Sequence, residues 1–135
     1  MAKTNSVGQG AREVYGAVGI DGEVPIEGTA ISIKAVTIST IGDNTIHTPA
    51  AGNRIELGYL AISADGGNSA DVIATVKFGA AGAAIYKVSL KAGSIYARNI
   101  GAGNRFGDSG LDTALVVSLS ANQTVHVSVE YDEAL

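Results

Sequence analysis

The chain of 135 residues contains no cysteine and no tryptophan, and only 16% of its residues are charged. Without cysteine, disulfides, thiolate metal sites and cysteine nucleophiles are all excluded. The charged fraction lies well below the quarter that is usual for globular domains. We interpret this shortage of charge as a sign that much of the surface contacts other protein. No apolar run approaches the roughly 18 residues that a membrane-spanning helix needs, so we expect no membrane partner.

The charge that is present is slightly acidic, with a formal net charge of −4 and a pI near 5.0. Binding to nucleic acid depends on a basic patch that neutralises phosphates, and the nine lysines and arginines are scattered along the chain. We therefore expect no nucleic-acid partner. The polar N-terminal residues lack the apolar stretch of a signal peptide, which favours synthesis in a cytoplasm without export.

Short runs of alternating apolar and polar residues fill the chain after residue 28, and Gly, Asn and Asp separate them. Such alternation predicts strands with one buried face, and no segment has the pattern of a helix. The pattern predicts an all-β fold, either a single β-sandwich or a small barrel, jelly-roll-like, with about seven to nine antiparallel strands. The expected strands are Thr29–Ile41, Thr45–Thr48, Arg54–Ser63, Asp71–Phe78, Ala84–Leu90, Ser94–Arg98, Ala114–Leu119 and Thr124–Tyr131.

The alternation also predicts which residues face the core. The expected inward rows are Val72, Val76 and Phe78; Tyr86, Val88 and Leu90; Leu115, Val117 and Leu119; and Val125, Val127 and Val129, while Ile95 and Ala97 are the apolar positions of the strand between the second and third rows. In two of the expected strands, the apolar residues switch from one face of the strand to the other partway along. In the first, Ile31, Ile33 and Ala35 lie opposite Val36 and Ile38, which predicts a bulge near Ala35 or burial of both faces. In the third, Ile55, Leu57 and Tyr59 lie opposite Leu60 and Ile62.

Two turn sequences predict hairpins. Asp65–Asn68 contains two glycines and Ala121–Gln123 joins the last two strands. The oxygen atoms of Asp65, Asn68 and Asp71 could instead hold Ca²⁺, although their spacing is not that of an EF-hand loop. We favour turn chemistry, because Asx side chains stabilise turns through local hydrogen bonds.

Residues 1–28 differ from the rest and predict an extended N-terminal arm that precedes a β-sandwich domain at 29–135. The arm is interpreted either as a frayed terminus or as a segment that orders on a neighbouring protein. Its apolar residues Val14, Tyr15, Val18 and Ile20 are candidate partner-binding residues. A second candidate is the Gly-rich loop 98–113, because long loops in compact domains tend to carry contacts or function; its candidate residues are Arg98, Arg105 and Phe106.

No residue cluster has the pattern of a catalytic or cofactor site. The fragments Gly8-Gln-Gly10 and Gly101-Ala-Gly103 lack the strand, helix and Gly-Lys-Ser/Thr context of a phosphate-binding loop. His47 and His126 lack further metal ligands at matching spacing and an activated serine, so both are interpreted as solvent-facing strand residues. We expect a protein that is not an enzyme and that uses neither a cofactor nor a metal ion.

The second half of the chain carries a recurring pattern. It runs through Asn53-Arg-Ile-Glu-Leu-Gly-Tyr-Leu, Ala74-Thr-Val-Lys-Phe, Ala84-Ile-Tyr-Lys-Val-Ser-Leu-Lys-Ala-Gly, Ala114-Leu-Val-Val-Ser-Leu-Ser-Ala and Val125-His-Val-Ser-Val-Glu-Tyr. This pattern resembles the small β-rich structural proteins of tailed bacteriophages, most of all the capsid decoration (cement) proteins. The resemblance implies a homotrimer on the capsid surface of a virion, made in the host cytoplasm, with the major capsid protein as partner and residues 1–28 as the arm that contacts the shell.

Two alternatives remain open. A tail or fibre module of the same virion would contact a tail protein instead. A sugar-binding adhesin with a β-sandwich fold would need a shallow groove lined by Tyr59, Tyr86 or Tyr96, whereas a symmetric trimer with extended arms would favour the decoration protein.

Overall fold

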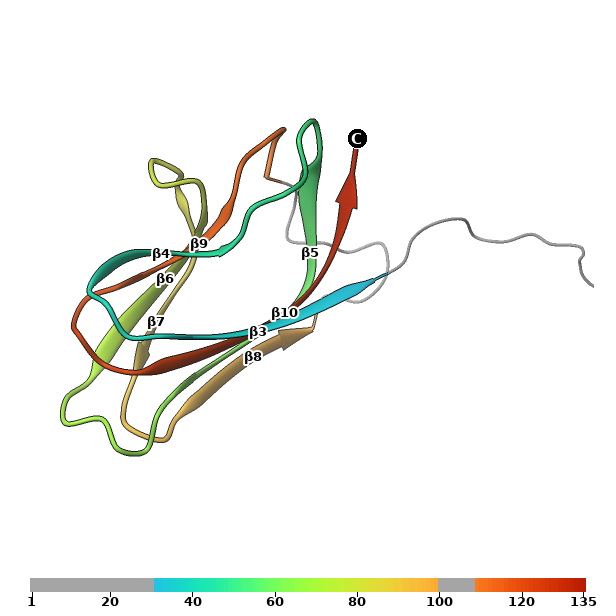
Figure 1. The fold of residues 1–135 in the computed structure, drawn as a ribbon. Helices are drawn as coiled ribbons and strands as arrows, with labels where there is room; N and C mark the ends of the chain where they lie inside the picture. The colour runs from blue at the N-terminus through green and yellow to red at the C-terminus, as the bar shows by residue number, and fades with distance from the viewer. Residues whose placement is uncertain (1–30, 100–108) are drawn as a thin grey trace, which may run out of the picture. The chain divides into compact units, whose positions relative to one another are not determined.

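Eight strands make up most of the residues that the computed structural model describes, which are residues 31–99 and 109–135 (Figure 1). They correspond one to one with the eight expected strands. The strands are β3 (Ser32–Ile38), β4 (Gly42–His47), β5 (Arg54–Ala64), β6 (Val72–Phe78), β7 (Ala84–Leu90), β8 (Ile95–Asn99), β9 (Leu115–Leu119) and β10 (Val125–Ala134). The domain boundary near residue 28 and the predicted arm lie outside the described residues.

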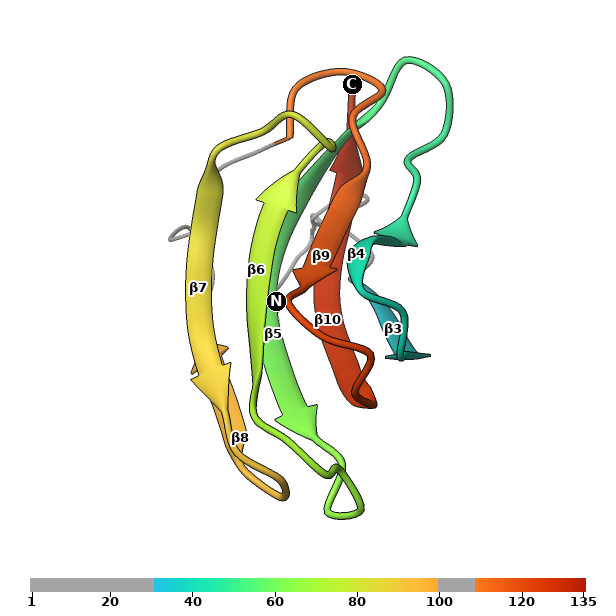
Figure 2. The same cartoon turned by 90° about the vertical axis from the view of Figure 1, so that its left-hand side faces the viewer.

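The strands form two antiparallel four-stranded sheets, with the orders β3-β10-β5-β8 and β4-β9-β6-β7. Figure 2 shows the two sheets lying one in front of the other, which makes a sandwich. Their strand order is that of an eight-stranded jelly roll, so the all-β sandwich prediction is confirmed. A fold of this kind carries many unrelated functions and does not by itself identify one.

The two predicted hairpins are wrong. β5 and β6, which flank Asp65–Asn68, lie in different sheets, and so do β9 and β10, which flank Ala121–Gln123. Among the eight described strands, only β6 and β7 are consecutive in the sequence and also paired with each other. The turn residues do reverse the chain, but the apolar rows of the joined strands then face each other across the core. That arrangement buries both rows, whereas a hairpin would place them side by side in one sheet.

The core lies between the two sheets and contains the predicted rows. Val72, Val76, Leu90 and the rows of β9 and β10 are each at most 2% exposed, and Phe78, Tyr86 and Val88 pack against them half-buried. Burying an aliphatic side chain of this size contributes roughly 1.5–3 kcal/mol. The alternation on β6, β7, β9 and β10 therefore predicted the core correctly.

The phase change in β5 arises from a bulge at Gly58. Glu130 of β10 pairs with Tyr59 and Tyr131 pairs with Leu57, so Gly58 has no partner position. Leu57 and Leu60 are consequently both fully buried. The expectation that Tyr59 shares the face of Leu57 is wrong, because the extra residue turns the tyrosine to the outer face.

The expectation of a bulge or two buried faces in β3 is also wrong. The register of β3 on β10 is continuous from Ile38 to Ser32, and Ile33 is 76% exposed. β3 is an edge strand of the described sheet, and its outward residues Ile33, Ala35 and Thr37 are exposed. On β8, Tyr96 packs against the core, whereas Ile95, one of the apolar positions of that expected strand, is 72% exposed.

Candidate functional site

One predicted partner-binding residue, Arg98, lies within the described part of the chain. It sits near the end of β8 and pairs in register with the core residue Leu60, so it lies on the inner side of that edge strand. Its guanidinium carbon is 5.7 Å from the ring centroid of Tyr86 on β7. The other candidates, Val14, Tyr15, Val18, Ile20, Arg105 and Phe106, lie outside the described residues.

The tyrosines expected for an adhesin groove do not lie together. The rings of Tyr86 and Tyr96 are 5.7 Å apart and tilted by 47°, and both pack against the core where β7 and β8 come close. Tyr59 lies on the outer face of the β3-β10-β5-β8 sheet, where it pairs with Asn99 of β8. Tyr86 and Tyr96 therefore close one side of the sandwich with Arg98, and the three tyrosines do not line a common surface.

The outer face of the β3-β10-β5-β8 sheet is unevenly charged, because Arg54, Glu56 and Asp132 lie on it beyond Glu130, whereas the stretch of β10 from Glu130 to His126 carries little charge. In that stretch, pairing places the outward side chains in three rows, which are Ile33, Glu130, Tyr59 and Asn99; Ala35, Ser128, Ala61 and Ala97; and Thr37, His126, Ser63 and Ile95. Glu130 is the only carboxylate in these rows, and they contain no lysine or arginine. The middle row holds only alanine and serine, so another protein surface could approach the backbone closely. We call these three rows the plain face.

The outer face of the second sheet also carries charged residues. A row across it contains Asp43, Ser118, Thr75 and Lys87. Asp43 also forms an ion pair with Lys77 at 3.1 Å, and the hydrogen bond from Lys77 lowers the pKa of the Asp43 carboxyl. The three rows of the plain face thus contain fewer charged residues than this part of the second sheet.

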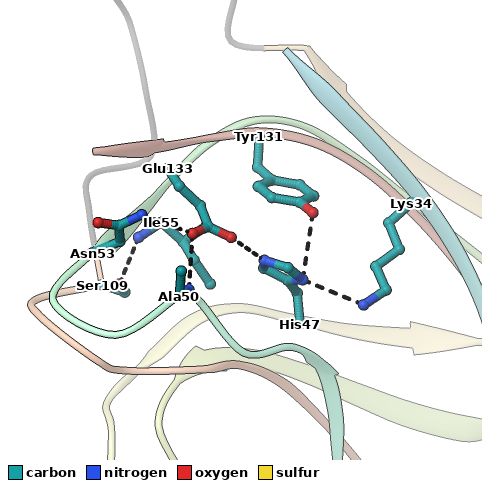
Figure 3. A network of polar contacts seen from close by, with 8 residues as sticks. All are labelled: Lys34, His47, Ala50, Asn53, Ile55, Ser109, Tyr131 and Glu133. Carbon is teal, nitrogen blue, oxygen red and sulfur yellow. Dashed lines mark hydrogen bonds and ion pairs between the residues drawn. The ribbon is translucent and has the colours of Figure 1, made fainter. Parts of the chain in front are cut away.

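A polar cluster joins the two sheets near one end of the sandwich (Figure 3). His47 extends from β4 toward Glu133 on β10, and its Nε2 lies 2.5 Å from Glu133 Oε2. Glu133 Oε1 accepts hydrogen bonds from the backbone N–H of Ala50 at 2.9 Å and from Nδ2 of Asn53 at 3.1 Å. These partners, His47 foremost, lower the pKa of Glu133 from 4.5 to about 2.

The partners of the other ring nitrogen of His47 favour one tautomer of the imidazole. His47 Nδ1 lies 3.3 Å from Nζ of Lys34 and 3.4 Å from the hydroxyl oxygen of Tyr131. Because an ammonium group can only donate, Nδ1 must be the acceptor, and the ring proton must be on Nε2, where it is donated to Glu133. This assignment follows from the hydrogen-bond partners.

The cluster has the properties of a structural link. Both ring nitrogens of His47 and both carboxylate oxygens of Glu133 have protein partners, and the two side chains are only 15% and 22% exposed. Nearby, Ser109 Oγ accepts a hydrogen bond from the backbone N–H of Ile55 and donates to the carbonyl of Gly110. The prediction that His47 faces solvent is wrong, because β4 packs over the end of β10 and encloses the ring.

A second polar network ties together the two turns that were predicted to be hairpins. Asn68 and Thr124 exchange two hydrogen bonds of 2.9 Å, from Asn68 Nδ2 to the Thr124 carbonyl and from the Thr124 N–H to Asn68 Oδ1. Asp65 accepts from the N–H of Gly67 at 2.9 Å and contacts His126 Nε2 at 3.0 Å. The hydrogen bond to His126 is the main cause that lowers the pKa of Asp65. His126 lies on the outer face, as predicted.

The side chains of Asp65 and Asn68 therefore stabilise these turns through hydrogen bonds, as predicted. Asp71, the third oxygen ligand of the calcium alternative, lies instead 3.5 Å from Nζ of Lys91. Within residues 31–99 and 109–135, no three His, Asp or Glu side chains come together in a geometry that could hold a metal ion. The same residues contain no helix that is long and apolar enough to cross a membrane.

Comparison with known proteins gives little similarity. No protein-family model and no curated protein sequence matches the chain. Among solved structures, the chain is similar to a chain of the cyanophage Pam1 capsid asymmetric unit, with 16% sequence identity, a TM-score of 0.40, and coverage of 98% of this chain and 99% of that one. A similarity of this size does not establish a shared family.

Proposed function

We propose that the chain is a structural protein of a bacteriophage virion, and that it acts as a head decoration protein which binds the major capsid protein and stabilises contacts between capsid subunits. The observation that carries the proposal is the plain face, three adjacent rows of outward side chains in which Glu130 is the only carboxylate and no lysine or arginine occurs. A surface depleted of charge at its centre is typical of protein–protein interfaces. The pattern resemblance to phage decoration proteins supports the same conclusion.

The mechanism is additive burial on a repetitive surface. Each copy lays the plain face against the shell, and the middle row of Ala35, Ser128, Ala61 and Ala97 permits close contact. Residues 1–28 contribute a second contact when a partner supplies the other half of an apolar surface. Ordering each residue costs about 1–2 kcal/mol of backbone entropy, and each buried apolar side chain returns roughly 1.5–3 kcal/mol. Association of copies as a trimer would multiply a modest affinity per site.

The role that we propose is non-enzymatic. The groups that could have served in catalysis, His47, Glu133 and Ser109, each hold a structural hydrogen bond within the sandwich. The polar clusters instead brace the two sheets, which suits a protein whose task is to present a rigid surface. The working location is then the outer surface of the capsid.

A binding experiment tests the plain face. Purified chain is mixed with capsids that lack it, and sedimentation separates bound from free protein. Ala61→Glu places a carboxylate at the centre of the plain face and should weaken binding strongly. Thr75→Glu is the matched control, because Thr75 is an equally half-buried, outward residue on a central strand of the other sheet. Equal binding by both variants would contradict docking through this face.

A truncation tests the contribution of the arm. Deleting residues 1–20 should leave a folded domain, as judged by far-UV circular dichroism, that binds capsids much more weakly than the full chain. If the truncated protein binds as tightly as the full chain, the arm makes no contact and the sandwich alone carries attachment. Binding to purified tails and not to capsids would favour the tail or fibre alternative.

A further inference from the structure

Among the residues that the structure describes, β3 has one backbone edge with no paired strand. It pairs with β10 on one side, and no strand within residues 31–99 and 109–135 pairs with the peptide groups along its other side. Figure 2 shows β3 and β4 on the same side of the sandwich, where each is the edge strand of its sheet. An edge of this kind is a template for another strand unless the sequence prevents it.

The sequence of β3 contains little of the usual protection of an edge strand. The strand Ser32–Ile38 has no proline and no bulge, and its only charged residue is Lys34. The ammonium group of Lys34 is turned toward His47 Nδ1, at 3.3 Å, and so does not guard the edge. The outward side chains are Ile33, Ala35 and Thr37, and Ile33 is 76% exposed. The strand is therefore available for main-chain pairing with an uncharged partner strand.

The sequence of β3 is complementary to itself. In an antiparallel pair, residues directly opposite each other share a face of the sheet. When two copies of β3 pair about Ala35, the midpoint of the seven-residue strand, Ile33 lies opposite Thr37 and Lys34 lies opposite Val36. No charges of like sign are opposed, and β-branched side chains meet on the exposed face, which stabilises strand pairs. Pairing about Lys34 would place two ammonium groups opposite each other and is disfavoured.

We propose that β3 is the contact between two copies of this chain, which join edge to edge as an antiparallel pair centred on Ala35 and so make a continuous eight-stranded sheet. The contact is isologous and has two-fold symmetry. A ladder of seven residues is only about 23 Å long and makes a small interface, so it forms when copies are close together. The proposal does not depend on the proposed virion role, although the contact could link neighbouring copies or trimers on a repetitive surface.

Disulfide trapping tests the register. The chain has no cysteine, so a single introduced cysteine reports one contact. In the proposed pair the two Ala35 Cα atoms are about 4.5–5.5 Å apart, which a disulfide can span. Full-length Ala35→Cys, oxidised at millimolar protein concentration, should become a covalent dimer. Ala97→Cys is the matched control, because Ala97 is an exposed alanine of the same row on the opposite edge strand β8, and it should remain largely monomeric.

A charge substitution separates strand pairing from random collision. In the Ala35→Cys background, adding Ile33→Lys should abolish the covalent dimer, because it places a protruding charge on the edge. Adding Ile95→Lys, at a 72% exposed isoleucine on β8, should leave the dimer unchanged. The proposal is overturned if Ala35→Cys yields no more dimer than Ala97→Cys, as expected if residues 1–30 of the same chain occupy the edge. It is also overturned if Ile33→Lys and Ile95→Lys have equal effects.

Discussion

The polar cluster around Glu133 should make the stability of the sandwich depend on pH. The folded state lowers the pKa of Glu133 from 4.5 to about 2, so the folded chain holds the ionised form more strongly than the unfolded chain does. A carboxyl group whose pKa is lower in the folded state stabilises the fold at pH values above its unfolded pKa. That stability is lost as the pH falls through 4.5 toward 2. The shift would correspond to roughly 3 kcal/mol if the carboxylate were shielded from water.

The expected effect is smaller because water reaches the site. The side chain of Glu133 is 22% exposed, so we expect screening to reduce its contribution to about 1–2 kcal/mol at neutral pH. Glu133→Gln removes the charge and should lower the free energy of unfolding by about that amount at neutral pH. Near pH 3 the wild type has lost much of the contribution, and the two proteins should become similar in stability.

Urea unfolding followed by far-UV circular dichroism, repeated between neutral pH and about pH 3, measures this difference. Glu130→Gln is the matched control, because Glu130 lies on the same strand and faces outward, with no side-chain partner among the described residues. It should follow the wild-type pH dependence. The reasoning is refuted if Glu133→Gln loses stability on acidification as steeply as the wild type.

Two further substitutions test the core and the turns. Val127→Asp should prevent folding, because an unpaired carboxylate on the inner face of β10 costs about 3 kcal/mol or more, whereas Ser128→Asp on the outer face should fold; circular dichroism and solubility distinguish them. Asn68→Ala removes both hydrogen bonds to the Thr124 backbone and should cost about 1–3 kcal/mol, measured by urea unfolding. A cost near zero would mean that water replaces the amide.

The sequence predicted the strands and most of the core because side-chain alternation is a local property. Val72, Val117 and Val127 are buried as expected, since a slip by one residue would expose each row. The same local pattern fails where tertiary context decides. Ile33 and Ile95 are large apolar residues of a type that is usually buried, yet both lie on the outer faces of edge strands. The sequence indicated an irregularity in β5 through the switch of its apolar residues between faces. It did not indicate that Tyr59 is the residue that the bulge turns outward.

Contacts between distant segments could not be read from the sequence. His47 and Glu133 are 86 positions apart, and neither stands in a recognisable motif. They meet because the jelly-roll strand order places the end of β4 against the end of β10, which depends on the choice between a hairpin and a crossing to the other sheet. The turn sequences are compatible with a hairpin and also with a crossing to the other sheet. The plain face likewise became apparent only when the register aligned the outward residues of four strands.

The most direct test of the proposed role is to locate the protein on the virion. Electron cryo-microscopy of purified particles from a phage that encodes this chain would show where the sandwich lies. The proposed function predicts density of its size and fold on the outside of the capsid, repeated at equivalent positions, with the plain face turned toward the shell. Particles that contain the chain nowhere on the capsid surface, or only in the tail, would contradict a head decoration protein.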